Sequence, residues 1–245
     1  MPQAAAEDAP MSTLKLITFD LDNTLWPVDE VIRQAEKVCS EWIAERHPEV
    51  AHSLTASRIR DLRTALIREK PHYLNNLTAL RRDAMARAFE QAGYSQREAG
   101  RIADDAFVVF HEARNRVTFF PGALEVLETL ADSYQLGALT NGNADLKQIG
   151  IADLFAFHHS AETVGKRKPA PDMFLAALRC AGVQASQAMH VGDHPQEDVQ
   201  AARDHGWHAV WANLIDLEWP VELERPRHHI HNLHELTDLV PLFDD

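Results

Sequence analysis

Acidic residues directly follow two short apolar segments of the chain, where carboxylates can serve in acid–base chemistry or bind a metal. Asp20 and Asp22, separated by one residue, follow the first segment, and Asp193 follows a later one, with Asp198 one helical turn beyond it. The first pair converges on one small volume if the backbone past a strand end is extended. The alternatives are a turn rich in Asp and Asn for this pair, and a helix-capping role for Asp193.

Two further segments carry groups suited to binding an anion. Thr140 and Asn141 begin the sequence Thr-Asn-Gly-Asn, which supplies a hydroxyl, an amide and backbone N–H groups leading into a helix N-terminus. Asn-Gly is also a turn signal. Residues 165–171 place three cations, the last of them Lys168, before a proline that can begin a helix. A solvated basic loop is the alternative for this second segment.

The elements that must position these groups are short strands alternating with helices. Residues 14–20 are apolar and β-branched, as expected for a strand buried on both faces of a parallel sheet. Similar segments occur at 135–140, 155–160, 188–192, 208–212 and 229–233, with helical patterns at 121–133, 145–149, 171–181 and 195–205. This alternation predicts an α/β fold with a Rossmann-like, doubly wound parallel sheet.

Because the polar groups follow predicted strands, we expect them at one edge of the sheet, where open α/β sheets bind ligands. Asp20, Asp22 and Asp193 would form a cluster of negative charge there. Two carboxylates ~4 Å apart repel by about 4 kcal/mol at an effective dielectric constant of about 20. A cation relieves that repulsion, and oxygen ligands favour Mg²⁺. The pattern therefore predicts a Mg²⁺ cofactor bound by these three aspartates.

A long helical block separates the first two predicted strands. Helical patterns cover 28–46, 55–69, 76–92 and 95–114, far more chain than a simple crossover between parallel strands requires. The block is therefore expected to be an inserted domain near the end of the first strand. The predicted organisation is a disordered tail at 1–12, an α/β catalytic core at 13–25 plus 117–245, and an all-helical cap domain at 26–116.

Composition restricts the class of protein and its partners. The chain has 245 residues, 45% of them apolar, and a formal charge of −13, which excludes a disordered chain and disfavours nucleic acid and anionic membranes as partners. Cys39 and Cys180 lie in separate helical patterns and suggest buried thiols in a reducing compartment. No secretory signal or apolar segment of membrane-spanning length occurs. We expect a cytoplasmic enzyme, monomeric or homodimeric.

The ordered motifs resemble those of the haloacid dehalogenase superfamily. They are Phe19-Asp-Leu-Asp-Asn-Thr-Leu25, Leu139-Thr-Asn-Gly142, Lys168-Pro-Ala-Pro-Asp-Met-Phe174 and Val191-Gly-Asp193 with Asp198. The resemblance extends from residue 14 to about residue 211, and the helical block resembles the helical cap of that superfamily.

The resemblance implies a role for each matched residue. Asp20 would be the nucleophile and Asp22 the general acid and base, while Asp193 would complete the Mg²⁺ site. Asp198 would support the metal waters or Lys168. The phosphate would be bound by three residues, namely Thr140, Asn141 and Lys168.

The second carboxylate indicates which reaction of the superfamily to expect. Dehalogenases that resemble the chain at the first aspartate lack a counterpart of Asp22, because a halide leaves without a proton and no metal is used. We therefore expect a Mg²⁺-dependent phosphatase that hydrolyses small phosphorylated metabolites through an aspartyl-phosphate. Bacterial phosphatases acting on flavin mononucleotide and riboflavin-pathway phosphates are the nearest resemblance. The alternatives are a phosphomutase, a 2-haloacid dehalogenase and a non-catalytic protein that binds a phosphorylated ligand.

Substrate contacts in the helical block are expected from Trp26, His72 and Tyr73, because aromatic and cationic groups can stack on a flavin or a nucleobase. Packing between helices is the alternative. Four histidines lie near the C-terminus, at His228, His229, His231 and His234. Their separations do not fit the usual spacing of paired metal ligands, so a surface segment around an edge strand is predicted there.

Overall fold

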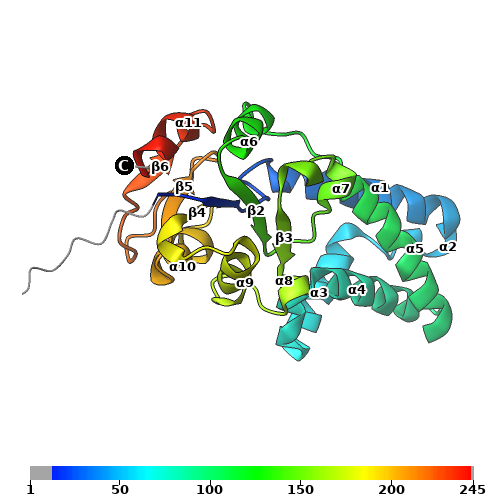
Figure 1. Ribbon diagram of the computed structural model, residues 1–245. Coiled ribbons are helices and arrows are strands. Elements are labelled where there is room, and N and C mark those ends of the chain that lie inside the picture. The colour runs from blue at the N-terminus through cyan, green and yellow to red at the C-terminus, as the bar shows by residue number, and fades with distance from the viewer. Residues whose placement is uncertain (1–12, 244–245) are drawn as a thin grey trace, which may run out of the picture.

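A six-stranded parallel sheet forms the centre of the protein, as a computed structural model that describes residues 13–243 shows (Figure 1). The strand order is β3-β2-β1-β4-β5-β6, with β1 (Leu16–Phe19), β2 (Gln135–Thr140), β3 (Phe157–Ser160), β4 (Ala188–Gly192), β5 (His208–Ala212) and β6 (His228–Ile230). After β1 the chain adds β2 and β3 on one side of it, and then crosses to the other side to add β4, β5 and β6. This is the doubly wound arrangement predicted from the sequence. The predicted tail at 1–12 lies outside the described residues.

The central strands are buried on both faces, which explains their continuous apolar sequences. Leu16 of β1 packs in one apolar cluster, whereas Ile17 and Phe19 pack in another, because successive side chains of a strand point to opposite faces. Strand register places Phe19 level with Ala138 of β2 and Val191 of β4. The ends of these three strands therefore lie side by side, and the residues that follow them meet at one edge.

Helices cover both faces of the sheet (Figure 1). One face packs against α6 (Ala123–Ala131), α7 (Leu146–Ile149) and α11 (Glu235–Leu239), and the other against α9 (Asp172–Ala181) and α10 (Ala201–Asp204). Short elements complete the core: α8 (Ala161–Val164), η2 (Ala152–Leu154), η3 (Ala185–Gln187) and η5 (Val240–Phe243). The predicted helix at 121–133 begins at Ala123, after Gly122 with a φ of +80°. A side chain at Gly122 would come within 2.4 Å of His234.

The predicted helix at 195–205 is divided into two different helical forms. Residues Pro195–Gln200 form a π-helical segment, η4, and the α-helical turn of α10 follows. The N–H of Val199 reaches back five residues to the carbonyl of His194 at 3.3 Å. Such wide turns occur often at functional sites because they redirect one side chain, and this one contains Asp198.

The inserted block is helical throughout, as predicted. It contains α1 (Val28–Arg46), α2 (Pro48–Ala51), α3 (Ala56–Glu69), η1 (Pro71–Asn75), α4 (Leu77–Gln91) and α5 (Gln96–Arg114). Side-chain caps at Thr55, Asn76 and Ser95 satisfy N–H groups at the starts of α3, α4 and α5. The helices lie beyond one end of the sheet in Figure 1 and bury an apolar cluster of their own. No helix in residues 13–243 combines the length and apolarity that crossing a membrane requires.

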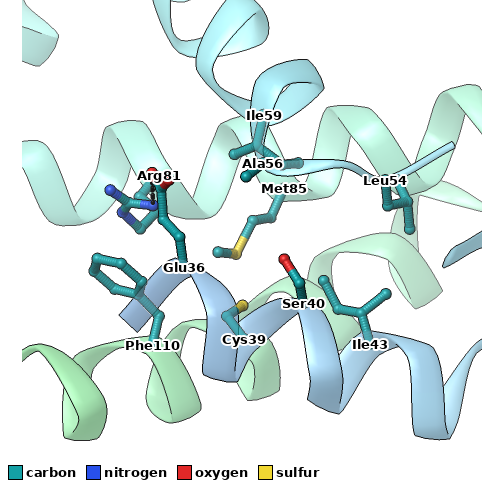
Figure 2. Close-up of a pocket in the computed structure, with 10 residues that line it drawn as sticks. All are labelled: Glu36, Cys39, Ser40, Ile43, Leu54, Ala56, Ile59, Arg81, Met85 and Phe110. Atoms are coloured by element: carbon teal, nitrogen blue, oxygen red, sulfur yellow. Dashed lines mark ion pairs between the residues drawn. The ribbon is translucent and has the colours of Figure 1, made fainter. Parts of the chain in front are cut away.

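The interior of the block contains a small cavity with a charged group in its wall (Figure 2). Arg81 lies 3.6 Å from the centre of the Phe110 ring and 3.6 Å from a carboxylate oxygen of Glu36. Burial lowers the pKa of Arg81 to about 9 against the opposing effect of Glu36. Cys39 lines the same cavity, and its burial raises the pKa of the thiol to about 11.

The two cysteines should react very differently with thiol reagents. Cys39 is buried with a raised pKa, whereas Cys180 on α9 is exposed, so the expectation of two buried thiols is wrong for Cys180. The thiolate is the reactive form. At pH 8 we expect a maleimide to label one thiol per native chain and both thiols in denaturant. Cys180→Ser should abolish the native labelling, as mass spectrometry would show. Fast labelling of Cys39 in the native protein would contradict this.

Candidate active site

Loops after three adjacent strands and one loop between two helices form a polar hollow at the sheet edge. Asp20 follows β1, and its N–H donates to the carbonyl of Val191 at 2.9 Å. Thr140 ends β2, Asp193 follows β4, and Lys168 lies between α8 and α9. The hollow is lined by Asp20, Asp22, Asn23, Val28, Leu77, Thr140, Asn141, Gly142, Arg167, Lys168, Asp193, His194, Glu197 and Asp198. The predicted core motifs therefore do meet in one place.

Lys168 is a buried cation at the base of this hollow. Its ammonium, 1% exposed, donates to Asp20 Oδ1 at 2.8 Å, Asp198 Oδ1 at 2.6 Å and the Leu139 carbonyl at 2.6 Å. All three of its hydrogens are thereby used. Burial disfavours the charged form, but the two carboxylates outweigh it, so the pKa of Lys168 is raised. The side chain is therefore a fixed positive charge beside Asp20.

The three buried carboxylates respond differently to their surroundings. Burial raises the pKa of Asp20 well above its usual value despite the opposing effect of Lys168, and burial and Asp198 raise that of Asp193 to about 7. Asp198 is equally buried, yet Lys168 and His190 outweigh burial, so its pKa is lowered. Asp20 and Asp193 are therefore the carboxylates that lack sufficient positive charge nearby.

These carboxylates fit a hard divalent cation. Oxygens of Asp20, Asp193 and Asp198 all lie within 4.8 Å of one another, and Mg²⁺ prefers oxygen ligands. Asp193 has no ion-pair partner among residues 13–243. Both oxygens of Asp198 are already engaged, Oδ1 with Lys168 and His190 and Oδ2 with the N–H of His194 at 2.9 Å. Asp20 and Asp193 therefore have more free coordinating capacity than Asp198.

Asp198 is positioned by a residue that the sequence did not single out. His190 on β4 places Nε2 3.1 Å from Asp198 Oδ1, and its Nδ1 lies 2.8 Å from the hydroxyl of Thr18. A side chain at Gly192 would come within 2.4 Å of the Asp198 carboxyl group. A histidine inside an apolar strand is the only sequence signal for this contact.

Asp22 lies in a different environment from the other carboxylates. Trp26 Nε1 donates to its Oδ1 at 2.7 Å, and Arg114 Nη2 donates to Oδ1 and Oδ2 at 3.0 and 2.8 Å. The carboxylates that cluster closely enough to hold a cation are those of Asp20, Asp193 and Asp198, whereas the Asp22 carboxylate pairs with an arginine 92 residues away in the sequence. The metal set of Asp20, Asp22 and Asp193 stays a prediction.

Thr140 and Asn141, both expected to bind phosphate, have unequal freedom to do so. The Thr140 hydroxyl accepts from the N–H of Gly142 at 2.9 Å, which leaves its own hydrogen available. The amide of Asn141 donates to the Lys168 carbonyl at 3.0 Å and to Glu197 at 2.7 Å, and accepts from the Lys168 N–H at 2.7 Å. Both of its amide hydrogens are used, so this side chain ties two loops together instead.

The aromatic residues expected to contact a substrate do not line the hollow. Trp26 is fully buried and packs edge-on against Phe119 with ring centres 5.8 Å apart. Tyr73 is buried in the helical block, with its hydroxyl bonded to Asp83 and its ring stacked on His72. None of the three predicted residues lines the hollow, and the residues of the block that do are Val28 and Leu77. The expected stacking contacts therefore do not match this structure.

The sequence also did not single out two charged residues at the wall of the hollow. Arg167 Nη2 donates to Glu197 at 2.6 Å, and both side chains are partly exposed to the hollow. The sequence indicates the basic loop at 165–171 but predicts a role only for Lys168 in it. The C-terminal histidines form no comparable group: within the described chain, the only cluster of three potential metal ligands is the acidic one.

Comparison with known proteins agrees with this arrangement. The family model of haloacid dehalogenase-like hydrolases matches residues 14–206. The 5-amino-6-(5-phospho-D-ribitylamino)uracil phosphatase YigB of Escherichia coli is 31% identical, with 94% of this chain and 98% of the relative covered. A glyceraldehyde 3-phosphate phosphatase of Pyrococcus abyssi is 28% identical, with 81% of each chain covered.

A solved structure is also similar over nearly the whole chain. The crystal structure of a 2-haloacid dehalogenase from Pseudomonas syringae pv. Tomato DC3000 has 41% sequence identity and a TM-score of 0.88, covering 94% of this chain and all of the other. The named activities of these similar proteins differ, whereas their fold and superfamily agree. The chain is thus an enzyme that belongs to the haloacid dehalogenase-like hydrolase family.

Proposed function

We propose that the protein is a Mg²⁺-dependent phosphatase that hydrolyses small phosphorylated metabolites. The observation that carries this proposal is Asp20 at the base of an open hollow, bonded to the buried ammonium of Lys168, with Asp193 and a second carboxylate, Asp22, nearby. Phosphoryl transfer from a dianionic ester requires positive charge and a proton donor at one place. The relatives named as phosphatases add support.

Asp20 is the proposed nucleophile. Its Oδ1 is held by Lys168, whereas its Oδ2 has no hydrogen-bond partner among residues 13–243. Attack of Oδ2 on phosphorus breaks the bond to the ester oxygen and yields an aspartyl-phosphate. Asp22 gives its proton to the departing oxygen, and later takes a proton from the water that attacks the intermediate. The products are an alcohol and inorganic phosphate.

The remaining groups bind and stabilise the phosphate. Mg²⁺, held by Asp20 and Asp193 with Asp198 beside them, would screen the charge between the nucleophile and the phosphate. Lys168 contributes a fixed charge and orients Asp20, since its hydrogens are already engaged. Thr140 can donate its free hydroxyl hydrogen to a phosphate oxygen.

We assign substrate choice to the helical block. In this proposal residues 26–116 are the cap, and residues 13–25 with 117–245 are the catalytic core. Polar contacts join the two near the hollow: besides those of Trp26 and Arg114 with Asp22, they include Thr78 N–H to Glu162 at 2.8 Å, Arg167 N–H to Asn75 at 3.1 Å, and Asn143 to the Thr78 hydroxyl at 3.2 Å. Flavin mononucleotide or a related ribityl phosphate is the proposed substrate, which the name of the E. coli relative supports.

A second candidate function is hydrolysis of a 2-haloacid, which the similarity to the P. syringae protein favours. That reaction releases a halide, which leaves without a proton. Asp22 would then have no proton to transfer, although it lies on the wall of the hollow with a charged partner. The phosphatase proposal gives this carboxylate a use, and we therefore prefer it.

The product that is released distinguishes the candidates, and replacement of the nucleophile tests both. The wild-type protein with Mg²⁺ should release phosphate from p-nitrophenyl phosphate and flavin mononucleotide, and Asp20→Asn should abolish the release because an amide is a poor nucleophile. EDTA should also stop it. Chloride release from 2-chloropropionate without phosphate release would instead support the dehalogenase, and a fully active Asp20→Asn variant would eliminate both mechanisms.

Replacement of Asp22 should slow the reaction most for esters whose leaving group most needs a proton. Asp22→Asn preserves shape and removes proton transfer, which is worth about 10²–10⁴ in rate. We expect a loss of that size in kcat/KM on alkyl phosphates, and a much smaller loss in kcat/KM on p-nitrophenyl phosphate, whose leaving group is a weak base. Equal losses in kcat/KM on both esters would argue against the role, because kcat/KM reports the steps up to formation of the aspartyl-phosphate and not the later activation of water.

The metal site can be tested without turnover. Mg²⁺ that binds only the folded protein stabilises it by about 2.7 kcal/mol at roughly a hundredfold excess over Kd. Urea unfolding should show this gain in the wild type and its loss in Asp193→Asn, which removes a free carboxylate of the site. Asp153→Asn, an exposed position on η2, is the matched control and should keep the gain. An unchanged gain in Asp193→Asn would exclude this residue as a ligand.

A further inference from the structure

We propose that Arg114 is a positioning residue that aims Asp22 for proton transfer. The inference rests on the proposed function, because Asp22 must first be the general acid and base. Arg114 is the last residue of α5 and belongs to the helical block, whereas Asp22 follows β1 of the core. The contact between them therefore joins the block directly to the reacting groups.

The hydrogen bonds of Asp22 distinguish its two oxygens. Oδ1 accepts from both Trp26 Nε1 at 2.7 Å and Arg114 Nη2 at 3.0 Å, whereas Oδ2 accepts, from the residues that the structure describes, only the hydrogen bond of Arg114 Nη2 at 2.8 Å. A carboxylate oxygen has two lone-pair sites, so Oδ1 is filled and Oδ2 keeps one site open. Asp22 lines the hollow. We assign the exchanged proton to Oδ2.

The residues around the contact between Arg114 and Asp22 are closely packed. Arg114 is 1% exposed, and its Nε also donates to Asn143 Oδ1 at 3.2 Å, in the loop after β2. A side chain at Gly142 would lie 2.6 Å from Asp22 Oδ2 and 3.3 Å from Arg114 Nη2. Because Gly142 has no side chain, Asp22 Oδ2 and the Arg114 guanidinium can occupy this space. The position of the carboxylate is thus fixed by three separate parts of the chain.

A role only in fastening the block to the core explains the arrangement less well. Arg114 Nη1 is buried and has no hydrogen-bond partner in the described chain, and an unsatisfied buried donor costs stability. Replacing a buried ion pair by apolar residues of similar volume is often neutral or stabilising. Nη2 donates to both oxygens of Asp22 and so fixes the orientation of the carboxylate, which a contact that only fastened the block to the core would not require.

The test compares leaving groups in a variant without the guanidinium. Arg114→Met should lower kcat/KM on glycerol phosphate by about tenfold or more, a fraction of the usual contribution of general acid–base catalysis. On p-nitrophenyl phosphate the loss in kcat/KM should stay below about twofold, since that leaving group needs little protonation. The ratio kcat/KM reports the steps up to formation of the aspartyl-phosphate, so the later use of Asp22 as a base does not enter the comparison. Arg114→Lys, which keeps the charge, should recover part of the loss on glycerol phosphate.

Two further variants separate positioning from folding. Arg116→Met removes an exposed arginine two residues away and should leave both rates unchanged. In an Asp22→Asn background, Arg114→Met should reduce the remaining kcat/KM on glycerol phosphate by less than about twofold, because residues that act as a unit are not additive. If the methionine variant does not fold, as circular dichroism would show, the lysine variant and its double mutant with Asp22→Asn decide the question.

The outcomes separate this inference from the function on which it rests. Phosphate release by the wild type, with Arg114 variants that lose kcat/KM equally on both esters, overturns the positioning role alone. Full additivity of the Arg114 and Asp22 substitutions overturns it as well. A wild-type protein that hydrolyses neither ester overturns the proposed function, and the positioning role with it. A loss of activity confined to the ester with the poor leaving group supports the positioning role of Arg114.

Discussion

The buried ammonium of Lys168 is the group on which the arrangement of the site depends. It bonds at once to the residue after β1, to the end of β2 and to the π-helical segment after β4, through Asp20, the Leu139 carbonyl and Asp198. Removing one partner of a buried ion pair typically costs about 3–5 kcal/mol, because a charge is left unpaired. The same cation allows two carboxylates to lie close together in a protein whose formal charge is −13.

Close approach of backbone and side chains is the second constraint. Glycines at positions 142 and 192 stand where any side chain would collide with Asp22 or Asp198. The wide turn of η4 supplies the rest of the geometry, since it presents Asp198 to both Lys168 and His190. The charge arrangement and the backbone path are therefore matched, and neither would produce the site alone.

The helical block reaches the reacting groups through its two ends. Trp26 lies just before α1, Arg114 ends α5, and both donate to the carboxylate of Asp22. A movement of the block would therefore alter the hydrogen bonds of one carboxylate in the core. Conformational steps of lids commonly set the rate of enzymes that close over a substrate, and under the proposed function such a step would act on the proton-transfer group itself.

The sequence alone determined the fold and the composition of the site. Short apolar segments predicted the strands, with 135–140, 188–192 and 208–212 observed at those bounds, because burial on both faces requires unbroken apolar sequence. The motifs identified Asp20 and Asp193 because groups that follow parallel strands meet at one edge, and the basic loop before a proline identified Lys168. Only the tertiary structure decided the partners of each side chain. Arg114, His190 and the closed packing of Trp26 and Tyr73 arise from contacts between distant segments, and hydrophobic periodicity carries no information about which distant side chain a polar group will meet.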